Sequence, residues 1–484
     1  MAASTASTTS APAEPGQSAA TSRTSTPRRG FDSLDVETHV DALPVEGQLP
    51  PWLSGSLLRT GPAKWEVGAQ QMRHWFDGLA MLHRFAFADG AVSYANRFLH
   101  TRAWRAAAES GQIEYSEFAT DPCRSLFQRV TAMFSPKISD NANVNLVKLG
   151  DRFIAMTETP IPVQFDARTL ETAGVAYDVP GMLTTAHPHL DRASKGMLNY
   201  AAKLGPRNSY RFFLVHPGSS SPRTIASKPV REPAYMHSFG LTERWLVLVE
   251  FPYVVNPLAL ALSGRPYIEN YRWRPERGTQ IHLFDRSSGE AAGPFQTDAC
   301  FGFHHVNAFE TGDEVSIDIC TYPDPQIVQD LYLERLREGK RVTAAALERF
   351  RVNPSSGAVA RERLVEEPIE LPRINYGRCN ERRYRYTWGV GAASGWLDRI
   401  VKADLERGDS TIWTQEGCYP GEPVFVAAPG AQHEDDGVLL SVVLDGGEGS
   451  SFLLVLDAAT LSEIARAKVP HHIPFGFHGQ FARE

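Results

Sequence analysis

The 484-residue chain has a formal net charge of −7 and an ordinary globular composition, with 42% hydrophobic and 22% charged residues. The length is sufficient for a large core, and the acidic balance argues against nucleic acid as a partner, because phosphate binding needs a basic face. No run of about 18 apolar residues occurs, so no transmembrane helix is expected. The five cysteines are scattered without a CxxC pair, which is typical of reduced thiols in a cytosolic protein.

Residues 1–30 are rich in Ala, Ser, Thr and Pro and lack large apolar side chains. Such a segment cannot offset its ordering entropy, so we expect a disordered tail. It has no apolar core of the kind found in signal peptides, and the Arg28–Arg29 pair is followed by FDSLDVE, which argues against twin-arginine export. We therefore expect a cytoplasmic protein in which residues 31–484 form a single domain.

After the tail the chain is dominated by short strands separated by turn residues. NVNLVKL and RFIAMTE flank Gly150–Asp151 as a hairpin, and similar pairs are HSFGLT with WLVLVEF, AFE with VSIDICTY, and GVLLSVVLD with SFLLVLD. A strand followed by Asp and a polar turn recurs in QFDARTLE, LFDRSSGE and VLDAATLSE. Repeated hairpins with a common corner predict an all-β fold, the β-propeller, although the irregular spacing does not give the number of blades.

Helical patterns are sparse. Residues 103–110, 325–339 and 343–351 are predicted to be surface helices that interrupt the strands as insertions. Two further apolar segments are residues 125–138, with hydrophobic side chains at roughly helical spacing, and residues 253–262. Segments of this kind either lie in a membrane interface or pack inside the protein.

Four histidines stand in separate motifs: His187 in TTAHPH, His237 in AYMHSFG, His304 in GFHHVN and His478 in PFGFHGQF. The inner strands of a propeller all run along one axis, so one imidazole from each of four blades can converge on a single ion. Imidazole suits Zn, Cu, Fe and Ni, and four neutral ligands leave a divalent ion its full charge. Three nearby positions compete as ligands: His189, His305 and the pair His471–His472.

Three glutamates lie in apolar, strand-like surroundings: Glu158 in IAMTETP, Glu370 in PIELPRIN and Glu422 in YPGEPVF. A buried carboxylate is costly unless it is paired, and a ligand histidine usually donates its second N–H to a carboxylate or carbonyl. These glutamates either hold the histidines or are solvated residues at strand ends.

The sequence resembles the carotenoid cleavage oxygenases from about Gly55 to Gly479, through GSLLRTGPAKWEVG, HWFDGLAMLHRF, TDPCRSLF, NANVNLVKLGDRFIAMTET, EPAYMHSFGLTERWLVLVEFP, FHHVNAFE, ELPRINY, EPVFV and PFGFHG. The resemblance implies seven blades with a helical or loop cap over one face. It also implies an Fe(2+) centre, with ligands on His187, His237, His304 and His478 held by Glu158, Glu370 and Glu422.

The activity that the resemblance implies is cleavage by O2 of a carbon–carbon double bond in a carotenoid or apocarotenoid, giving two aldehydes. TDPCRSLF, PYIENYRWRPERGT and FHHVNAFE are similar to the animal retinal-forming members, which favours central (15,15′) cleavage to retinal. One alternative is a stilbenoid-cleaving dioxygenase, which needs a tyrosine and a lysine in the tunnel to hold a phenol. The others are a retinoid isomerohydrolase and a propeller that binds without catalysis.

A polyene substrate needs an apolar tunnel, and aromatic side chains near the ligand motifs are its predicted walls: Phe76, Phe239, Phe303, Trp388 and Phe477. We expect this substrate and O2 as the partners, with no obligate protein partner. Because carotenoids reside in membranes, the resemblance also implies a monotopic contact with the inner face of the membrane, through residues 125–138 or 253–262.

Overall fold

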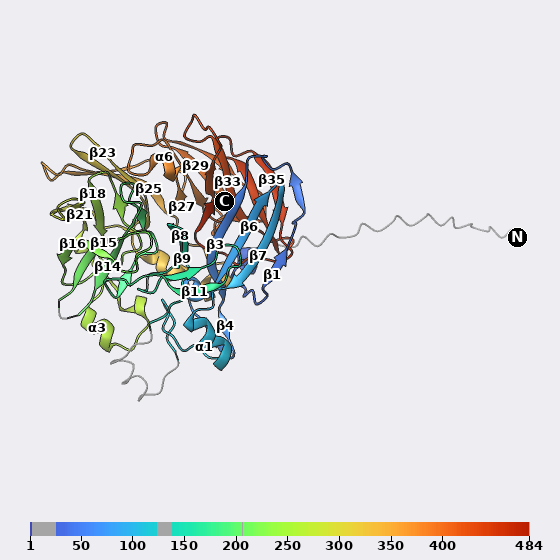
Figure 1. Ribbon diagram of the computed structural model, residues 1–484, viewed down its shortest axis with the longest axis horizontal. Helices are drawn as coiled ribbons and strands as arrows, with labels where there is room; N and C mark the ends of the chain where they lie inside the picture. Colours follow the sequence, from blue (N-terminus) through green and yellow to red (C-terminus); the bar gives the residue numbers. More distant parts are fainter. Residues whose placement is uncertain (2–25, 123–137, 206, 484) are drawn as a thin grey trace.

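The computed structural model describes Met1 and residues 26–122, 138–205 and 207–483. Within these ranges, seven sheets of four or more antiparallel strands surround a central axis (Figure 1). The predicted all-β propeller is therefore confirmed, as is the number of blades that the family resemblance implies.

The strands of each blade follow one another from the propeller axis outward. The first blade consists of β36 (Gly479–Ala482), β3 (Gly55–Lys64), β6 (Leu79–Ala88), β7 (Ala91–Phe98) and β1 (Thr38–Val40). The second consists of β8 (Asn145–Leu149), β9 (Arg152–Met156), β10 (Val163–Phe165) and β11 (Thr172–Val175). The third consists of β12 (Leu183–Thr184), β13 (His189–Leu190), β14 (Met197–Lys203), β15 (Ser209–Val215) and β16 (Arg223–Pro229).

The fourth blade consists of β17 (Gly240–Leu241), β18 (Trp245–Glu250), β21 (Thr279–Asp285) and β22 (Ala291–Thr297), and the fifth of β23 (Phe301–Thr311), β24 (Glu314–Tyr322), β25 (Ala346–Val352) and β26 (Val359–Arg363). The sixth consists of β27 (Glu370–Arg373), β28 (Tyr386–Gly391), β29 (Arg399–Asp404) and β30 (Asp409–Trp413). The seventh consists of β31 (Cys418–Pro420), β32 (Val424–Ala427), β33 (Gly437–Asp445), β34 (Ser450–Asp457), β35 (Glu463–Lys468) and β2 (Val45–Gly47).

The two ends of the described chain close the ring. β36, near the C-terminus, pairs with β3 in the first blade, and β2, near the N-terminus, pairs with β35 in the last blade. The first and last blades therefore each contain strands from both ends of the sequence. This closure also carries His478, which directly precedes β36, to the axis.

Blades pack on one another through both faces, which explains their nearly continuous apolar strands. In β34, Leu453 and Val455 belong to one apolar cluster, whereas Phe452, Leu454 and Leu456 belong to another. Alternate side chains of a strand point to opposite faces, so the two clusters are the contacts with the two neighbouring blades. Burial on both faces removes the polar alternation of a half-exposed strand.

The recurring Asp corner of the sequence is an Asx turn. Asp166, Asp285 and Asp457 each accept, through Oδ1, hydrogen bonds from the backbone N–H groups two and three residues later. Each aspartate stands at the turn between two paired strands: β10 and β11, β21 and β22, and β34 and β35. The aspartate thus fixes the turn without help from the rest of the blade.

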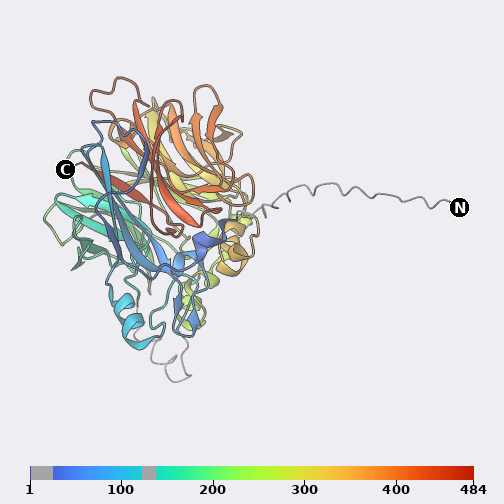
Figure 2. The same ribbon diagram turned by 90° about the vertical axis from the view of Figure 1, so that its right-hand side faces the viewer.

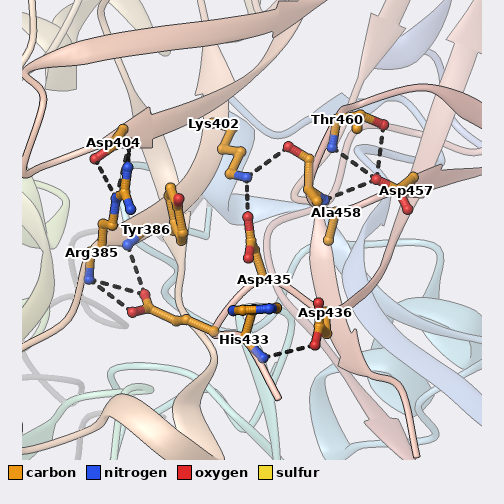
Figure 3. A network of polar contacts seen from close by, with 12 residues as sticks. Arg385, Tyr386, Lys402, Asp404, His433, Asp435, Asp436, Asp457, Ala458 and Thr460 are labelled. Carbon is orange, nitrogen blue, oxygen red and sulfur yellow. Dashed lines mark hydrogen bonds and ion pairs between the residues drawn. The ribbon is translucent and has the colours of Figure 1, made fainter. Parts of the chain in front are cut away.

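A polar network ties the last two blades together on their outer side (Figure 3). Lys402 on β29 donates to the carbonyl of Ala459, beside the Asp457 corner, at 2.7 Å, and pairs with Asp435. Glu434 accepts hydrogen bonds from the backbone N–H groups of Arg385 and Tyr386. The loop before β33 therefore stabilises the arrangement of two neighbouring sheets.

Small elements cover one side of the blades, where α1, β4 and α3 lie together (Figures 1 and 2). They include the predicted helix α1 (Arg102–Ser110). Residues 325–339 form two short helices, α4 (Gln326–Asp330) and α5 (Leu333–Arg337), with buried apolar faces. α6 (Tyr376–Cys379) lies on the other side of the blades, near β23 and β29 (Figure 1). The remaining small elements are α3 (Pro257–Leu262), β4 (Glu66–Val67), β5 (Gln70–Gln71), β19 (Tyr253–Val254), β20 (Arg272–Trp273), η1 (Pro27–Phe31), η2 (Trp75–Asp77), η3 (Tyr267–Asn270) and η4 (Pro275–Arg277).

The helix predicted over residues 343–351 is wrong, because β25 (Ala346–Val352) occupies most of that range. TAAALERF favours a helix by intrinsic propensity, but β25 pairs with β24 on one side and β26 on the other. Its Leu347, Phe350 and Val352 are fully buried. Two ladders and this burial outweigh a propensity difference of a few tenths of a kcal/mol per residue.

The first described element begins inside the segment that composition assigned to the tail, since η1 covers Pro27–Phe31 and buries Gly30 and Phe31. Residues 125–137 of the first predicted membrane segment lie outside the described residues. In the second, Tyr253–Val254 form buried β19, and α3 exposes Leu258 and Leu262. Among the described residues no helix is long and apolar enough to cross a membrane.

Acid should destabilise the propeller because buried histidines cannot take up protons in the folded state. Burial lowers the pKa of His74 and of His83 to about 3. Between pH 6.5, the ordinary pKa, and pH 3, each of these histidines is protonated in the unfolded chain but neutral in the folded protein. The stabilisation is therefore complete above pH 6.5 and falls by about 1.4 kcal/mol per pH unit per histidine as the pH decreases toward 3.

Asp77, whose pKa burial raises to about 6, takes up a proton in the folded state and offsets one of these histidines below pH 6. Urea unfolding at pH 7, 6 and 5 should therefore give a decreasing free energy of unfolding, and His83→Gln should reduce the slope. A free energy that is constant or rises toward acid would contradict this assignment.

Candidate metal centre and substrate cavity

The four motif histidines converge on the propeller axis. His187 lies between β12 and β13, His237 precedes β17, His304 lies in β23, and His478 precedes β36. One ligand nitrogen from each lies within 4.8 Å of the others. Residues as far apart as 187 and 478 thus form one site because each belongs to an axial strand or to the turn beside it.

Local irregularity in β23 allows His304 to face the axis. The register with β24 shifts on both sides of His305, and the Ser238 hydroxyl binds the carbonyl of Phe303 and the N–H of His305. A bulge of this kind redirects a side chain at the cost of one ladder position.

Each predicted glutamate binds one histidine. Glu158 Oε1 lies 2.7 Å from His237 Nδ1, Glu370 Oε2 lies 2.5 Å from His304 Nδ1, and Glu422 Oε1 lies 2.7 Å from His478 Nδ1. A carboxylate beside Nδ1 keeps the proton on that nitrogen and leaves the lone pair on Nε2. Tyr235 and Tyr322 donate to Glu158 and Glu370 and hold them in place.

The Nε2 atoms are arranged for a cation. Nε2 of His304 lies 3.1 Å from Nε2 of His478, and the same distance separates Nε2 of His187 from that of His237. In the His304–His478 pair both protons are held on Nδ1, so two lone pairs face each other. This contact is repulsive unless a positive ion lies between the rings. The residues present therefore fit a metal ion with imidazole ligands.

Burial keeps the imidazoles neutral, as metal ligands must be. It lowers the pKa of His187 and of His478 well below the ordinary value, with the neighbouring histidines adding to the effect. It also lowers the pKa of His237, although Glu158 opposes the shift. A neutral cluster has its lone pairs available at neutral pH.

Glu422 differs from the other two glutamates because two arginines surround it. It is fully buried and also accepts the N–H of Gly479 at 2.9 Å. Arg59 Nη1 lies 3.9 Å from it, and Arg373 Nε lies 3.0 Å away in an ion pair whose N–H is not aligned for a hydrogen bond. Burial raises the pKa of Glu422, and the arginines oppose the shift.

The same arginines hold the backbone that carries His478. Arg59 donates to the carbonyl of Phe477 at 3.1 Å, and Arg373 donates to that of Gly479. A Cβ on Gly479 would lie 2.6 Å from Arg59 Cγ, so only glycine permits this approach. Sequence reasoning missed both arginines, because nothing in their local sequence indicates a contact across the fold.

The competing histidines have other partners. His189 Nε2 lies 3.0 Å from the Phe239 carbonyl, His305 Nδ1 lies 2.8 Å from the Ser238 hydroxyl, and His472 Nε2 lies 3.2 Å from the Asp32 carbonyl. Alternation accounts for the adjacent pair in β23, where His305 faces away from His304. His189 is two residues beyond His187 and differs because it begins β13, whereas His187 lies in the turn before that strand.

A cavity of about 1130 Å³ lies against the cluster. His237, His304 and His478 line it, as do three of the predicted tunnel residues, Phe76, Phe303 and Phe477. Most of the other lining is apolar and consists of residues that were not predicted as tunnel walls: Trp75, Phe118, Val144, Leu183, Leu260, Ile369, Leu371, Val390 and Trp396. Aromatic walls of this size suit a long apolar ligand.

Two predicted tunnel residues lie elsewhere. Phe239 is fully buried between blades, where its ring lies 5.2 Å from that of Phe212. Trp388 is stacked on Phe425 at 4.7 Å and donates its indole N–H to the Ala458 carbonyl. Both predictions are wrong because proximity to a motif does not fix the face of the strand on which a side chain lies.

Glu370→Gln should weaken metal binding without unfolding the protein. The amide can still accept from the imidazole, but the charge that polarises His304 is lost. We expect a decrease in metal affinity of roughly 10- to 100-fold. Metal titration followed by elemental analysis measures this decrease, and thermal unfolding checks the fold. Wild-type affinity would show that Glu370 does not support a metal ligand.

The family described as "RPE65: Retinal pigment epithelial membrane protein" matches residues 31–483. The carotenoid-cleaving dioxygenase of Macaca fascicularis is 34% identical over 90% of this chain and 91% of its own, and the β,β-carotene 15,15′-dioxygenase of Homo sapiens is 33% identical over the same shares. A structure of a Synechocystis apocarotenoid oxygenase variant has a TM-score of 0.86, with 28% identity over 96% of this chain and 100% of its own. A cobalt-substituted structure of the Synechocystis enzyme has a TM-score of 0.85.

Proposed function

Because this chain belongs to the RPE65/carotenoid cleavage oxygenase family, we propose that it cleaves one carbon–carbon double bond of a carotenoid or apocarotenoid with dioxygen. It is an oxygenase, as its relatives are. The observation that supports this proposal most directly is the cluster of four histidines, three of which line a large cavity with aromatic walls.

We assign Fe(2+) as the ion and His187, His237, His304 and His478 as its ligands. Reactivity toward dioxygen is supplied by ferrous iron when it is bound. Four neutral imidazoles leave the ion its charge, and Glu158, Glu370 and Glu422 fix the orientation of three of them. His187 has no carboxylate partner among the described residues, so its position depends on the turn between β12 and β13.

The protein side chains position the polyene and exclude water. Phe76 and Phe303 lie beside the cluster, with ring centres 6.5 and 5.2 Å from that of His237. A polyene packed against them presents its double bonds to the Nε2 side of the imidazoles. No proton transfer is needed, because one alkene and one O2 give two aldehydes with all atoms accounted for. We propose central (15,15′) cleavage, with retinal as product.

Two features of the cavity argue against a phenolic stilbene as substrate. No lysine is part of the described lining, in which Arg265 is the cation. The two lining tyrosines are also engaged, since the Tyr267 hydroxyl contacts that of Tyr271 and the Tyr322 hydroxyl donates to Glu370. A phenol would therefore lack the tyrosine–lysine pair that its recognition requires.

Product analysis tests the proposal. Iron-loaded enzyme is incubated with β-carotene, an apocarotenal, resveratrol and a retinyl ester under ¹⁸O2, with oxygen uptake recorded. We expect uptake only with the polyenes that are cleaved, and one labelled oxygen in each aldehyde. Conversion of the ester without oxygen uptake would support an isomerohydrolase, and cleavage of resveratrol alone a stilbenoid dioxygenase. Iron binding without any product would indicate a binding propeller.

We also propose a peripheral contact with the cytoplasmic face of a membrane. Leu258 and Leu262 of α3 are 68% and 56% exposed, and both also line the cavity. An apolar substrate could therefore enter beside α3 without crossing water. Leu258→Ser combined with Leu262→Ser should reduce co-flotation with lipid vesicles while leaving metal content unchanged. Equal flotation of both proteins would contradict this contact.

A further inference from the structure

The metal site does not use every carboxyl group in the cavity wall. Glu158 and Glu370 hold histidines, whereas Glu117 and Asp121 line the cavity without contacting the cluster in the described part of the chain. Glu117 is held in a defined orientation, because the buried Ser139 donates its hydroxyl to Glu117 Oε1 at 2.6 Å. The Ser139 hydroxyl in turn accepts the N–H of Asn141 at 3.1 Å.

Glu117 lines the same cavity as a row of aromatic rings that reaches the histidines. The ring of Phe118, the next residue, lies 5.1 Å from that of Phe76, which lies 6.5 Å from that of His237. A chain that packs along these rings therefore has an interior bond at the cluster and one end near Glu117. An oriented polar group in a largely apolar cavity wall is a common way of fixing the direction of a ligand.

The surroundings of the Glu117 carboxyl favour its protonated form. Burial raises its pKa well above the usual range, and the nearby Asp77 and Asp140 raise it further against the hydrogen bonds of Ser139 and Asn141. A neutral carboxylic acid has an O–H donor, which an oxygen atom of a ligand can accept. A hydrocarbon end offers no acceptor, and its approach would leave this donor unpaired.

We propose that Glu117 donates a hydrogen bond to a carbonyl oxygen at the end of the polyene, so that the preferred substrate is an apocarotenoid aldehyde rather than a hydrocarbon carotene. This inference rests on the proposed function. It adds a group that selects the substrate and sets which double bond lies beside the cluster, since the distance from the aldehyde to the reacting bond is then fixed.

Paired substrates of equal polyene length, one ending in an aldehyde and one in a methyl group, test the proposal. Wild-type kcat/KM should favour the aldehyde by about 10-fold, the ratio that one buried hydrogen bond supports. Glu117→Leu should bring the ratio close to one and produce a mixture of cleavage positions. Glu117→Gln, which keeps a donor, should retain most of the preference, and Ser139→Ala, which releases the carboxyl, should lose part of it.

Thr343→Val is the matched control, because Thr343 also lines the cavity but its hydroxyl donates to Asp330, so the ratio should not change. Quenching of the cavity tryptophans Trp75 and Trp396 gives the affinity for each ligand without turnover. An unchanged ratio in Glu117→Leu, or an equal loss for both substrates in kinetics and binding, would overturn the proposal. Absence of cleavage by every form would overturn the proposed function instead. The ratio of the two ligand affinities would then still test the role of Glu117.

Discussion

Replacing His304 by alanine should remove the bound metal and abolish cleavage together. His304 Nε2 faces His478 at 3.1 Å, and its Nδ1 is held by Glu370. Without the imidazole, three ligands remain, and Glu370 keeps only its hydrogen bonds from Tyr322 and the N–H of Leu371. The affinity loss should exceed the roughly 10- to 100-fold that loss of an outer partner costs. Elemental analysis after anaerobic iron loading measures the metal, and oxygen uptake measures the turnover.

The neighbouring residue provides a control. His305 lies on the same strand, and its Nδ1 contacts the Ser238 hydroxyl rather than the cluster. His305→Gln should therefore retain metal near the wild-type ratio. If the His304→Ala protein held iron as the wild type does, or cleaved a polyene at the wild-type rate, the ligand assignment would be wrong.

Glu422→Leu should have the largest effect on stability of the changes at the site. The carboxylate is fully buried and balances Arg59, which is 5% exposed, and Arg373. Its removal leaves these guanidinium groups close together without an anion. Breaking a buried pair in this way costs about 3–5 kcal/mol of unfolding free energy. Urea unfolding of the metal-free proteins should show this loss, and metal titration should show weaker binding through His478.

Glu158→Gln separates the two consequences of that change. Glu158 binds His237 and Tyr235 and has no ion pair with an arginine among the described residues. We therefore expect its loss to weaken metal binding with only a small change in unfolding free energy. An equal loss of unfolding free energy in the two variants would contradict the assignment of the Glu422 effect to its ion pairs with Arg59 and Arg373.

These predictions reflect how a propeller builds a metal centre. Each histidine comes from a different axial segment, and the three glutamates come from connections or axial strands of other blades. No local motif could bring these groups together. The ring closure by β36 also places His478 beside Arg59 of β3, so the same segment completes the metal site and the fold.

Much of this arrangement could be predicted from local patterns. Paired apolar strands indicate the hairpins, and the aspartate after a strand indicates the Asx corners, because both depend on residues close in sequence. The seven site residues were implied by the family resemblance, because local patterns alone left other histidines open as ligands. Residues 343–351 show the limit: their helical propensity is clear, but the strands on either side, distant in sequence, decide the outcome.

Local sequence patterns are therefore enough to predict the strand-rich class, the corners of the blades and a set of histidines and glutamates that could serve a metal. The direction in which those side chains face, and what surrounds them, depends on how the blades pack. The packing turned His189 and His305 away from the cluster, excluded Phe239 and Trp388 from the cavity, and brought Arg59, Arg373 and Glu117 to their places. The physical reason is that burial and pairing depend on contacts between blades, and those contacts join residues whose separation in the sequence carries no pattern.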